Sequence, residues 1–239
     1  MNIRPHIIIN NVSSQTIQGL LISELAAISK PRVRTQVETV DGRSGDIVTP
    51  LGFEAYDKVI KIGLTYNYNI DDIIAFFNSE GVVVFSNEPD KYYRFAIYEQ
   101  IDFERLIKFK TAEVTFHIQP FKYSLLESEK TFNISSDPAE IKVRNSGNYY
   151  SRPTITITGS GVVSVSLNGS QILSIELGET EQTIIINAEQ MNAYSVDYIL
   201  LNRLVTGNYD NIKLNIGLNT INISGNVTTV KVDKYSRWI

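Results

Sequence analysis

The chain has 239 residues, of which 43% are hydrophobic and 20% charged, a balance that supports a globular core and excludes a largely disordered protein. The net charge is −4, and no cluster of Lys and Arg of the kind that grips nucleic acid is present. Cysteine is absent, which excludes disulfides, thiolate metal sites and cysteine nucleophiles. Because no apolar run reaches about 18 residues and the start lacks signal-peptide features, we expect folding in a cytoplasm, with no membrane span.

The first half of the chain predicts a β-rich domain with one helix. Short runs rich in β-branched and aromatic residues are separated by Gly, Asn and Pro, which is typical of strands. The helix is expected after the N-cap residue Asn69, with Asp71 and Asp72 in its first turn, apolar residues at helical spacing, and Gly81 as its stop. The strands are expected near residues 4–9, 15–22, 34–40, 58–66, 82–86, 92–100 and 105–119.

The most distinctive short stretch is Asp41-Gly42-Arg43-Ser44-Gly45-Asp46, between two of these strands. Two glycines bracket an arginine, and an aspartate stands at each end. Glycine adopts positive φ readily, so the stretch predicts a surface hairpin turn. A calcium loop is disfavoured, since only two carboxylates are present and the usual alternation of ligands is missing.

The second half predicts a β-sandwich. The strand pattern breaks between Pro120 and Lys130, which predicts a first domain of residues 1–125 and a second of residues 126–239. Asn168-Gly169 is a strong signal for a tight hairpin. Short strands at regular spacing favour a sandwich of jelly-roll type. These strands are expected at residues 140–144, 153–158, 162–167, 172–177, 183–187, 218–223 and 227–232.

Residue patterns that carry chemistry are weak. His6 and His117 are the only histidines, and we expect packed or rim side chains, not zinc ligands. Gly159-Ser160-Gly161 lacks the spacing of a hydrolase elbow and the helix that follows a phosphate loop, so a turn between two strands is expected. The carboxylate pairs Asp71/Asp72 and Glu179/Glu181 are explained by a helix start and a turn. We therefore predict no catalytic residue, no metal, no cofactor, and a protein that is not an enzyme.

Several features follow one another in a recognisable order. The first half carries Asp41–Asp46, Tyr56-Asp57, the strand Lys58–Thr65, the helix from Ile70 and the ending Gln119–Tyr123. The second half carries Asn145–Pro153, Ile155–Gly161, Ser166–Gly169, Ile185–Glu189, Gly217–Ile221 and finally Trp238. This order resembles the distal tail proteins of siphophages, in which a G-R-x-G-type turn stands where this chain has Asp41–Asp46. The resemblance implies a tail-ring domain followed by a galectin-like or jelly-roll domain.

The resemblance also implies a function. Distal tail proteins form a homohexameric ring at the virion tail tip that joins the tail tube protein to tail-associated lysin, fibre or receptor-binding proteins. The lumen of the ring lets the tape-measure protein and DNA pass, without sequence-specific binding. Assembly in the bacterial host cytoplasm is expected. Edge strands of two β domains suit the two different faces that a ring subunit needs. We accordingly expect Asp41, Arg43 and Asp46 to lie at an interface, with Arg43 in an intersubunit ion pair.

Two other classes of function stay open. A carbohydrate-binding module that contacts the host surface would expose an aromatic side chain on the second domain, and Tyr149, Tyr150 and Trp238 are the candidates. A glycosidase would need converging carboxylates in a cleft. For the aromatic residues of both halves, the core or a subunit interface is the favoured location.

Overall fold

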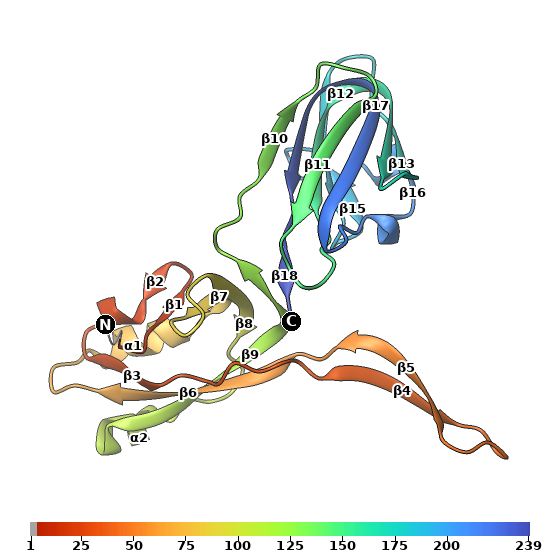
Figure 1. Cartoon of the computed structure of the whole chain (residues 1–239). Coiled ribbons are helices and arrows are strands. Elements are labelled where there is room, and N and C mark those ends of the chain that lie inside the picture. Colours follow the sequence, from red (N-terminus) through yellow and green to blue (C-terminus); the bar gives the residue numbers. More distant parts are fainter. Residues whose placement is uncertain (1–3) are drawn as a thin grey trace. The chain divides into compact units, whose positions relative to one another are not determined.

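The computed structural model describes residues 4–239, and the chain forms two compact units. The first unit runs to Leu125 and includes Ile239, and the second is Leu126–Trp238. Each unit has a hydrophobic core of its own. Most elements are antiparallel strands (Figure 1), which confirms the prediction of a mainly β protein.

The first unit is built on a curled antiparallel sheet with the strand order β2-β1-β7-β8-β9-β6-β3. Strands β4 and β5 form a separate two-stranded sheet, which we call the arm (Figure 1). The elements are β1 (Ile7–Ile9), β2 (Val12–Ser13), the 3-10 helix η1 (Ser14–Thr16), β3 (Leu20–Glu24), β4 (Val33–Thr39), β5 (Asp46–Phe53), β6 (Tyr56–Leu64), α1 (Ile70–Phe77), β7 (Glu80–Phe85), β8 (Lys91–Ala96), α2 (Phe103–Phe109) and β9 (Thr111–Ser124).

The core of the first unit follows from alternation in its long strands. In β9, Val114, Phe116 and Ile118 are fully buried while their neighbours are more exposed. Phe116 lies at the centre, with the rings of Phe85 and Phe95 at 5.7 Å and 5.2 Å between centroids. Aromatic pairs at this separation stabilise a core beyond their buried area. The expectation that aromatic side chains pack in a core is therefore confirmed for these residues.

Helix α1 begins where the sequence predicts it. Asn69 Oδ1 accepts a hydrogen bond from Asp71 N at 3.1 Å, so Asn69 is the N-cap. The helix ends at Phe77, and Gly81 lies inside β7 with a φ of 132°, so the expected stop at Gly81 is wrong. Asn78 is the C-cap instead.

A second helix, α2, corrects the prediction of one helix and of a strand over 105–119. Asp102 Oδ1 accepts a hydrogen bond from Arg105 N at 2.8 Å, which caps the helix start. Lys110 ends the helix in the left-handed conformation, with a φ of 59°. Only Leu106 of α2 is fully buried. A helix of 7 residues with one buried residue gives little periodic signal, and the alternation of β9 begins directly after it.

The second unit is a β structure with one branched antiparallel sheet system, whose main path is β10-β17-β12-β13-β16. Strand β11 also pairs with β17, and β14 pairs with β12 and β15. The elements are β10 (Lys130–Asn133), β11 (Ala139–Asn145), β12 (Thr154–Leu167), β13 (Ser170–Glu176), β14 (Gln182–Asn187), β15 (Asn192–Tyr194), η2 (Asn202–Leu204), β16 (Val205–Gly207), η3 (Tyr209–Asn211), β17 (Gly217–Asp233) and β18 (Arg237–Trp238).

Two glycine-containing stretches of the second unit are predicted by the sequence to form turns. Asn168 and Gly169 have φ of 51° and 87° between β12 and β13, which confirms the tight hairpin. Gly159-Ser160-Gly161 instead lies within the long strand β12, so the predicted turn there is wrong. The register between β12 and β17 shifts after Ser160, and a Cβ on Gly159 would lie 2.3 Å from Asn226 O. The glycines therefore permit a bulged, bent strand.

Candidate assembly interface

The arm arises from a turn sequence placed between two strand-forming runs. Strands β4 and β5 pair from Thr39 opposite Asp46 at the tip to Val33 opposite Phe53 at the base. Gly42 and Gly45 at the tip have φ of 81° and 83°. These values favour glycine because a side chain would be strained there. The predicted hairpin turn at Asp41–Asp46 is thereby confirmed.

One face of the arm carries an exposed pair of apolar side chains. Val37 and Val48 lie directly opposite each other, so their side chains share a face, and each is 56% exposed. Gln36 and Thr49 form the next pair, which lies on the other face because side chains alternate along a strand. A two-stranded hairpin without a third strand or a helix is marginally stable in water. The arm therefore leaves apolar side chains in contact with water.

The base of the arm is anchored in the first unit. Phe53 packs edge to face on Phe121, with 5.8 Å between ring centroids. Glu54 N donates a hydrogen bond to Arg32 O at 2.9 Å, which extends the pairing beyond the ends of β4 and β5. Since β6 begins at Tyr56, the arm and the central sheet share nearly continuous backbone. The base of the arm is therefore packed against the first unit, whereas its tip extends away from the core of that unit (Figure 1).

A buried lysine fixes the segment that leads into the arm. Lys58 is 3% exposed, and its Nζ donates a hydrogen bond to Ala27 O at 2.8 Å. The same Nζ lies 5.3 Å from the ring centroid of Tyr93 and 5.6 Å from that of Phe85. Burial lowers the pKa of Lys58 from its usual range, because the protein interior disfavours the charged form. The ring faces and the carbonyl compensate part of this penalty.

Glu88 organises the polar groups beside this lysine. Its carboxylate accepts hydrogen bonds from the hydroxyl of Tyr93 and from Nζ of Lys122. Burial, assisted by the negative charge of Glu88, raises the pKa of Tyr56 to about 12. The pKa of Tyr93 is raised by burial first and by its bond to Glu88 second. No local motif in the sequence indicates this cluster, because its members come from three strands and the turn between β7 and β8.

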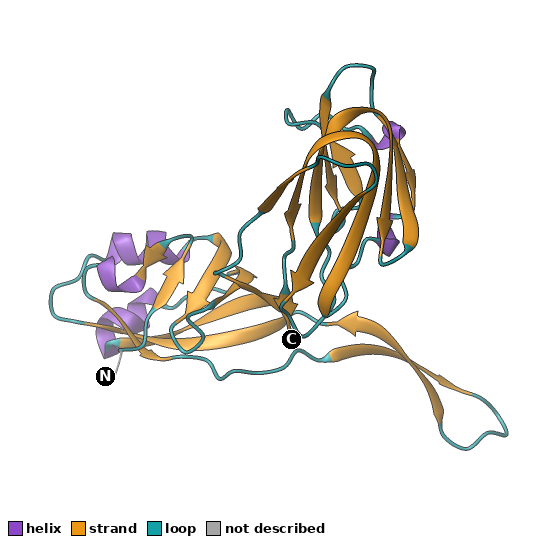
Figure 2. Ribbon diagram, turned by 45° about the horizontal axis from the view of Figure 1, so that its top comes forward, coloured by secondary structure: helices purple, strands orange, loops and turns teal. Residues whose placement is uncertain are grey.

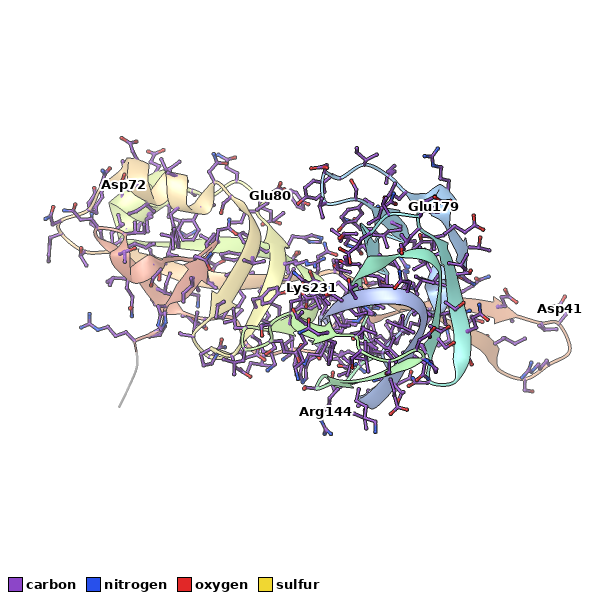
Figure 3. All side chains as sticks on the ribbon, turned by 90° about the horizontal axis from the view of Figure 1, so that it is seen from above. Asp41, Asp72, Glu80, Arg144, Glu179 and Lys231 are labelled. Atoms are coloured by element: carbon purple, nitrogen blue, oxygen red, sulfur yellow. The ribbon has the colours of Figure 1, made fainter. Side chains whose placement is uncertain are left out.

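The three residues predicted to lie at an interface gather at the arm tip. Asp41, Arg43 and Asp46 are all exposed, and Figure 3 shows Asp41 at the free end. Asp46 Oδ1 accepts a hydrogen bond from Thr39 Oγ1 at 3.3 Å. Among residues 4–239, neither Asp41 nor Arg43 forms an ion pair. Their role between subunits stays a prediction.

A cleft lies at the end of the sheet that is remote from the arm. Tyr56 pairs with Ile118 at the arm end of the β6–β9 pair, and Gly63 pairs with Thr111 at the other end. Strand β3 joins β6 at that other end and is the last strand of the sheet, so it keeps one edge without a strand partner among the described residues. A cleft of about 530 Å³ runs along this region, and we call it the seam cleft. It is lined by Arg4, Pro5, Ser14, Gln15, Leu20, Leu21, Ile22 and Ser23.

The aromatic candidates for sugar binding do not form a bare platform. The rings of Tyr149 and Tyr150 are 4.6 Å apart and partly buried. The guanidinium of Arg237 lies 4.7 Å from the Tyr150 ring, and Nζ of Lys213 lies 5.3 Å from it. Cations therefore occupy positions that a sugar ring would need. Trp238 is partly buried in β18.

One carboxylate of each candidate pair has a structural partner, and so has His117. Asp72 Oδ2 accepts a hydrogen bond from Asn69 Nδ2 at 2.8 Å in the first turn of α1, and Glu181 Oε1 accepts one from Thr228 Oγ1 at 2.7 Å. His117 lies at the rim, with Nδ1 at 2.9 Å from Asp57 Oδ1. No group of His, Asp and Glu in residues 4–239 is arranged to hold a metal ion. Neither α1 nor α2, nor any 3-10 turn of that range, is long and apolar enough to cross a membrane.

Comparisons with known proteins give a match in structure but not in sequence. No family model and no curated protein matches the chain. The crystal structure of the SPP1 Dit protein, described as a paradigm of the hub adsorption apparatus in phages that infect Gram-positive bacteria, superposes with a TM-score of 0.67. The two are 15% identical, and the match covers 95% of this chain and 97% of that one.

A chain of the activated phage P2 baseplate is also similar, with a TM-score of 0.51 and 10% identity over 96% of both chains. Both matches span the two units, so neither rests on one common β module. The resemblance to distal tail proteins is confirmed at the level of the fold: along nearly its whole length, this chain has the fold of a Dit-type baseplate hub protein.

Proposed function

We propose that the protein is a structural subunit of a phage tail tip, which assembles as a homohexameric ring through its first unit. The ring joins the tail tube to tail-associated or receptor-binding proteins and leaves a channel for the tape-measure protein and DNA. The second unit projects towards the adsorption proteins. The molecule is made in the host cytoplasm, acts in the virion, and has no catalytic role.

The observation that carries this proposal is the arm. Its apolar pair Val37 and Val48 is more than half exposed, and no third strand of residues 4–239 pairs with the arm. A second unpaired surface, the edge of β3, lies at the other end of the same sheet. A cyclic assembly needs two different complementary faces on each subunit. The fold shared with the SPP1 Dit protein supports the same assignment.

Sugar binding has less support as the main function. The candidate rings Tyr149 and Tyr150 have cations against them. A glycan array probed with the purified full chain should accordingly show no binding above background.

The test is the mass of the full chain in solution, measured by analytical ultracentrifugation over a concentration series and followed by negative-stain imaging. We expect a species of six copies that appears as a sixfold annulus with a central hole. A strict monomer at the highest concentration would contradict the proposal. Open filaments would also contradict it, since they show head-to-tail contacts that do not close.

A further inference from the structure

We infer that a cleft beside helix α1 binds a segment of another protein in which an apolar side chain is flanked by Lys or Arg. The cleft, which we call the α1 cleft, lies wholly within the first unit and has a volume of about 510 Å³. Helix α1 forms one wall, and the chain between Ile9 and Gln18 forms the other. Since one subunit supplies both walls, the inference does not rest on the proposed ring.

Both walls of the α1 cleft are fixed by backbone contacts. Asn10 and Asn11 have φ of 46° and 69°, which makes the connection between β1 and β2 a tight hairpin turn. Asn10 Oδ1 accepts a hydrogen bond from Val82 N at 2.9 Å. At the start of α1, Asn69 N donates a hydrogen bond to Gln18 O at 3.4 Å. A cleft whose walls are fixed before binding loses little conformational freedom when a ligand enters.

The α1 cleft has apolar side chains that are open to water. Val12 is 46% exposed, and Ala75 is also exposed. Ile9 and Phe76 line the cleft too and belong to the core of the first unit. The volume lies within the roughly 300–1,000 Å³ that is typical of binding pockets. An apolar side chain inserted here would remove apolar area of both proteins from water.

The charge around the α1 cleft is negative. Among the described residues that line it, Asp72 is the one charged residue. Asp71 and Glu80 are the sequence neighbours of Asp72 and of the lining residue Ser79. All three acidic residues are exposed, and none forms an ion pair within residues 4–239. Figure 3 shows Asp72 and Glu80 on the same side of the first unit. A Lys or Arg beside the inserted side chain would complement these carboxylates.

The same charge argues against other occupants. Nucleic acid and anionic phospholipids carry phosphates, which carboxylates repel. A second copy of the chain is disfavoured, because its arm tip holds Glu38, Asp41 and Asp46 against Arg43 alone. Figure 2 shows the helices of the first unit gathered at one end of its sheet, away from the arm, so the arm of the same copy does not cover the cleft. The favoured occupant is therefore a basic and apolar segment of a different protein.

Fluorescence anisotropy of two labelled probe peptides tests the inference on the full chain. One probe is a short amphipathic peptide of leucine and lysine, and the other carries glutamate at each lysine position. We expect the lysine peptide to bind in a salt-dependent manner and the glutamate peptide to bind about tenfold more weakly. Equal binding of both peptides, or binding of neither, overturns the inference.

Substitutions in the cleft test whether the lysine peptide binds there. Ala75→Arg fills the cleft and adds a cation at an exposed helix position where arginine is a good helix former, so binding should be lost. Val12→Thr should weaken binding about fivefold, because an apolar contact becomes polar. Glu80→Gln should weaken it by about twofold to fivefold, as expected for an exposed charge. Unchanged binding by the Ala75→Arg variant would show that the peptide binds elsewhere and contradicts the inference.

Matched controls lie outside the cleft. Val59→Thr changes a valine of β6 that is 44% exposed, and Glu179→Gln removes an exposed carboxylate of the second unit. Neither change should alter the affinity for the lysine peptide, and losses equal to those of the cleft variants would refute the site. Thermal melting of each variant checks that the fold is retained.

Two further measurements separate the other occupants. Sedimentation of the Ala75→Arg variant should show the same assembly state as the natural chain, whereas a changed state would assign the cleft to a second copy. Vesicles of phosphatidylglycerol should not bind the chain, and binding that Ala75→Arg abolishes would assign the cleft to lipid. Either of these results overturns the inference, whereas the absence of any ring contradicts only the proposed function.

Discussion

Replacing the apolar pair of the arm by isosteric polar residues should dissolve the ring and leave the monomer intact. The variant is Val37→Thr with Val48→Thr. Threonine matches valine in shape and in preference for strands, so the hairpin itself is retained. What changes is the free energy of burying the exposed face against a neighbour.

The magnitude follows from exposure. Each valine is 56% exposed, so docking removes about half of its surface from water. Full burial of a valine side chain contributes about 1.5–3 kcal/mol, which gives about 1 kcal/mol for each residue and about 2 kcal/mol for each subunit contact. A loss of that size weakens each contact by roughly 30-fold. The free energy of unfolding of the monomer should change by less than about 0.5 kcal/mol, because neither side chain belongs to the core.

Sedimentation over a dilution series measures the midpoint of ring dissociation, and chemical denaturation of the dilute protein measures the stability of the monomer. Gln36→Thr is the matched control, because Gln36 lies on the same strand but on the opposite face. We expect the control to dissociate at the same concentration as the natural chain. If the double threonine variant also does so, the apolar face of the arm is not buried in the assembly, and the reasoning behind the ring fails.

Three further predictions concern charge and the base of the arm. Arg43→Ala should reduce hexamer yield and thermal stability by an amount that salt diminishes, about 0.2–1 kcal/mol per contact for an exposed ion pair, and an unchanged ring excludes that pair. Lys58→Met should keep the fold but speed trypsin cleavage after Arg32, because the bond to Ala27 O that holds this segment is lost; Lys61→Met, which removes an exposed partner of Glu24, should not. Burial raises the pKa of Tyr56 from its usual 10.0 to about 12 in the folded protein, so the stabilising contribution of Tyr56 is complete below pH 10 and lost as the pH rises to 12. Tyr56→Phe should therefore show a smaller fall in melting temperature over that interval than the natural chain, and an equal fall would refute the link.

Local signals predict the turn of the arm and the start of α1, whereas strand β5 of the arm was not predicted. A hairpin turn depends on a few consecutive residues, so Gly42 and Gly45 suffice to place it. The start of α1 depends on a single N-cap residue, and Asn69 is that residue. The predicted interface residues Asp41, Arg43 and Asp46 belong to the same turn, so the sequence correctly places them together at the tip of the arm. The sequence does not indicate which residues they would contact.

Features that depend on distant residues were missed or misplaced. The start of β9 was expected at Arg105, yet α2 occupies that stretch because Leu106 fills a space in a core assembled from remote strands. The sequence predicts that the strand before Gly159 ends there, but β12 continues through it. Glycine is needed at this position because the backbone of Asn226 approaches too closely for a side chain. The seam cleft likewise has no local signature, because its walls come from the chain start, η1 and β3. Tertiary contacts decide each of these features, and one sequence does not display them.

The distribution of polar residues limits which contacts the two unpaired surfaces make. On the arm, Gln36 and Glu38 lie on the face opposite Val37, together with Ile47, so that face is the more polar of the two. On β3, the register with β6 shifts between Ile22 and Glu24, and Glu24 is paired with Lys61, which ends the regular edge after a few residues. A short, charged edge resists unspecific strand pairing. One adhesive face and one short edge per copy allow a single neighbour on each side, which is the condition for a contact that closes into a ring instead of spreading into a sheet.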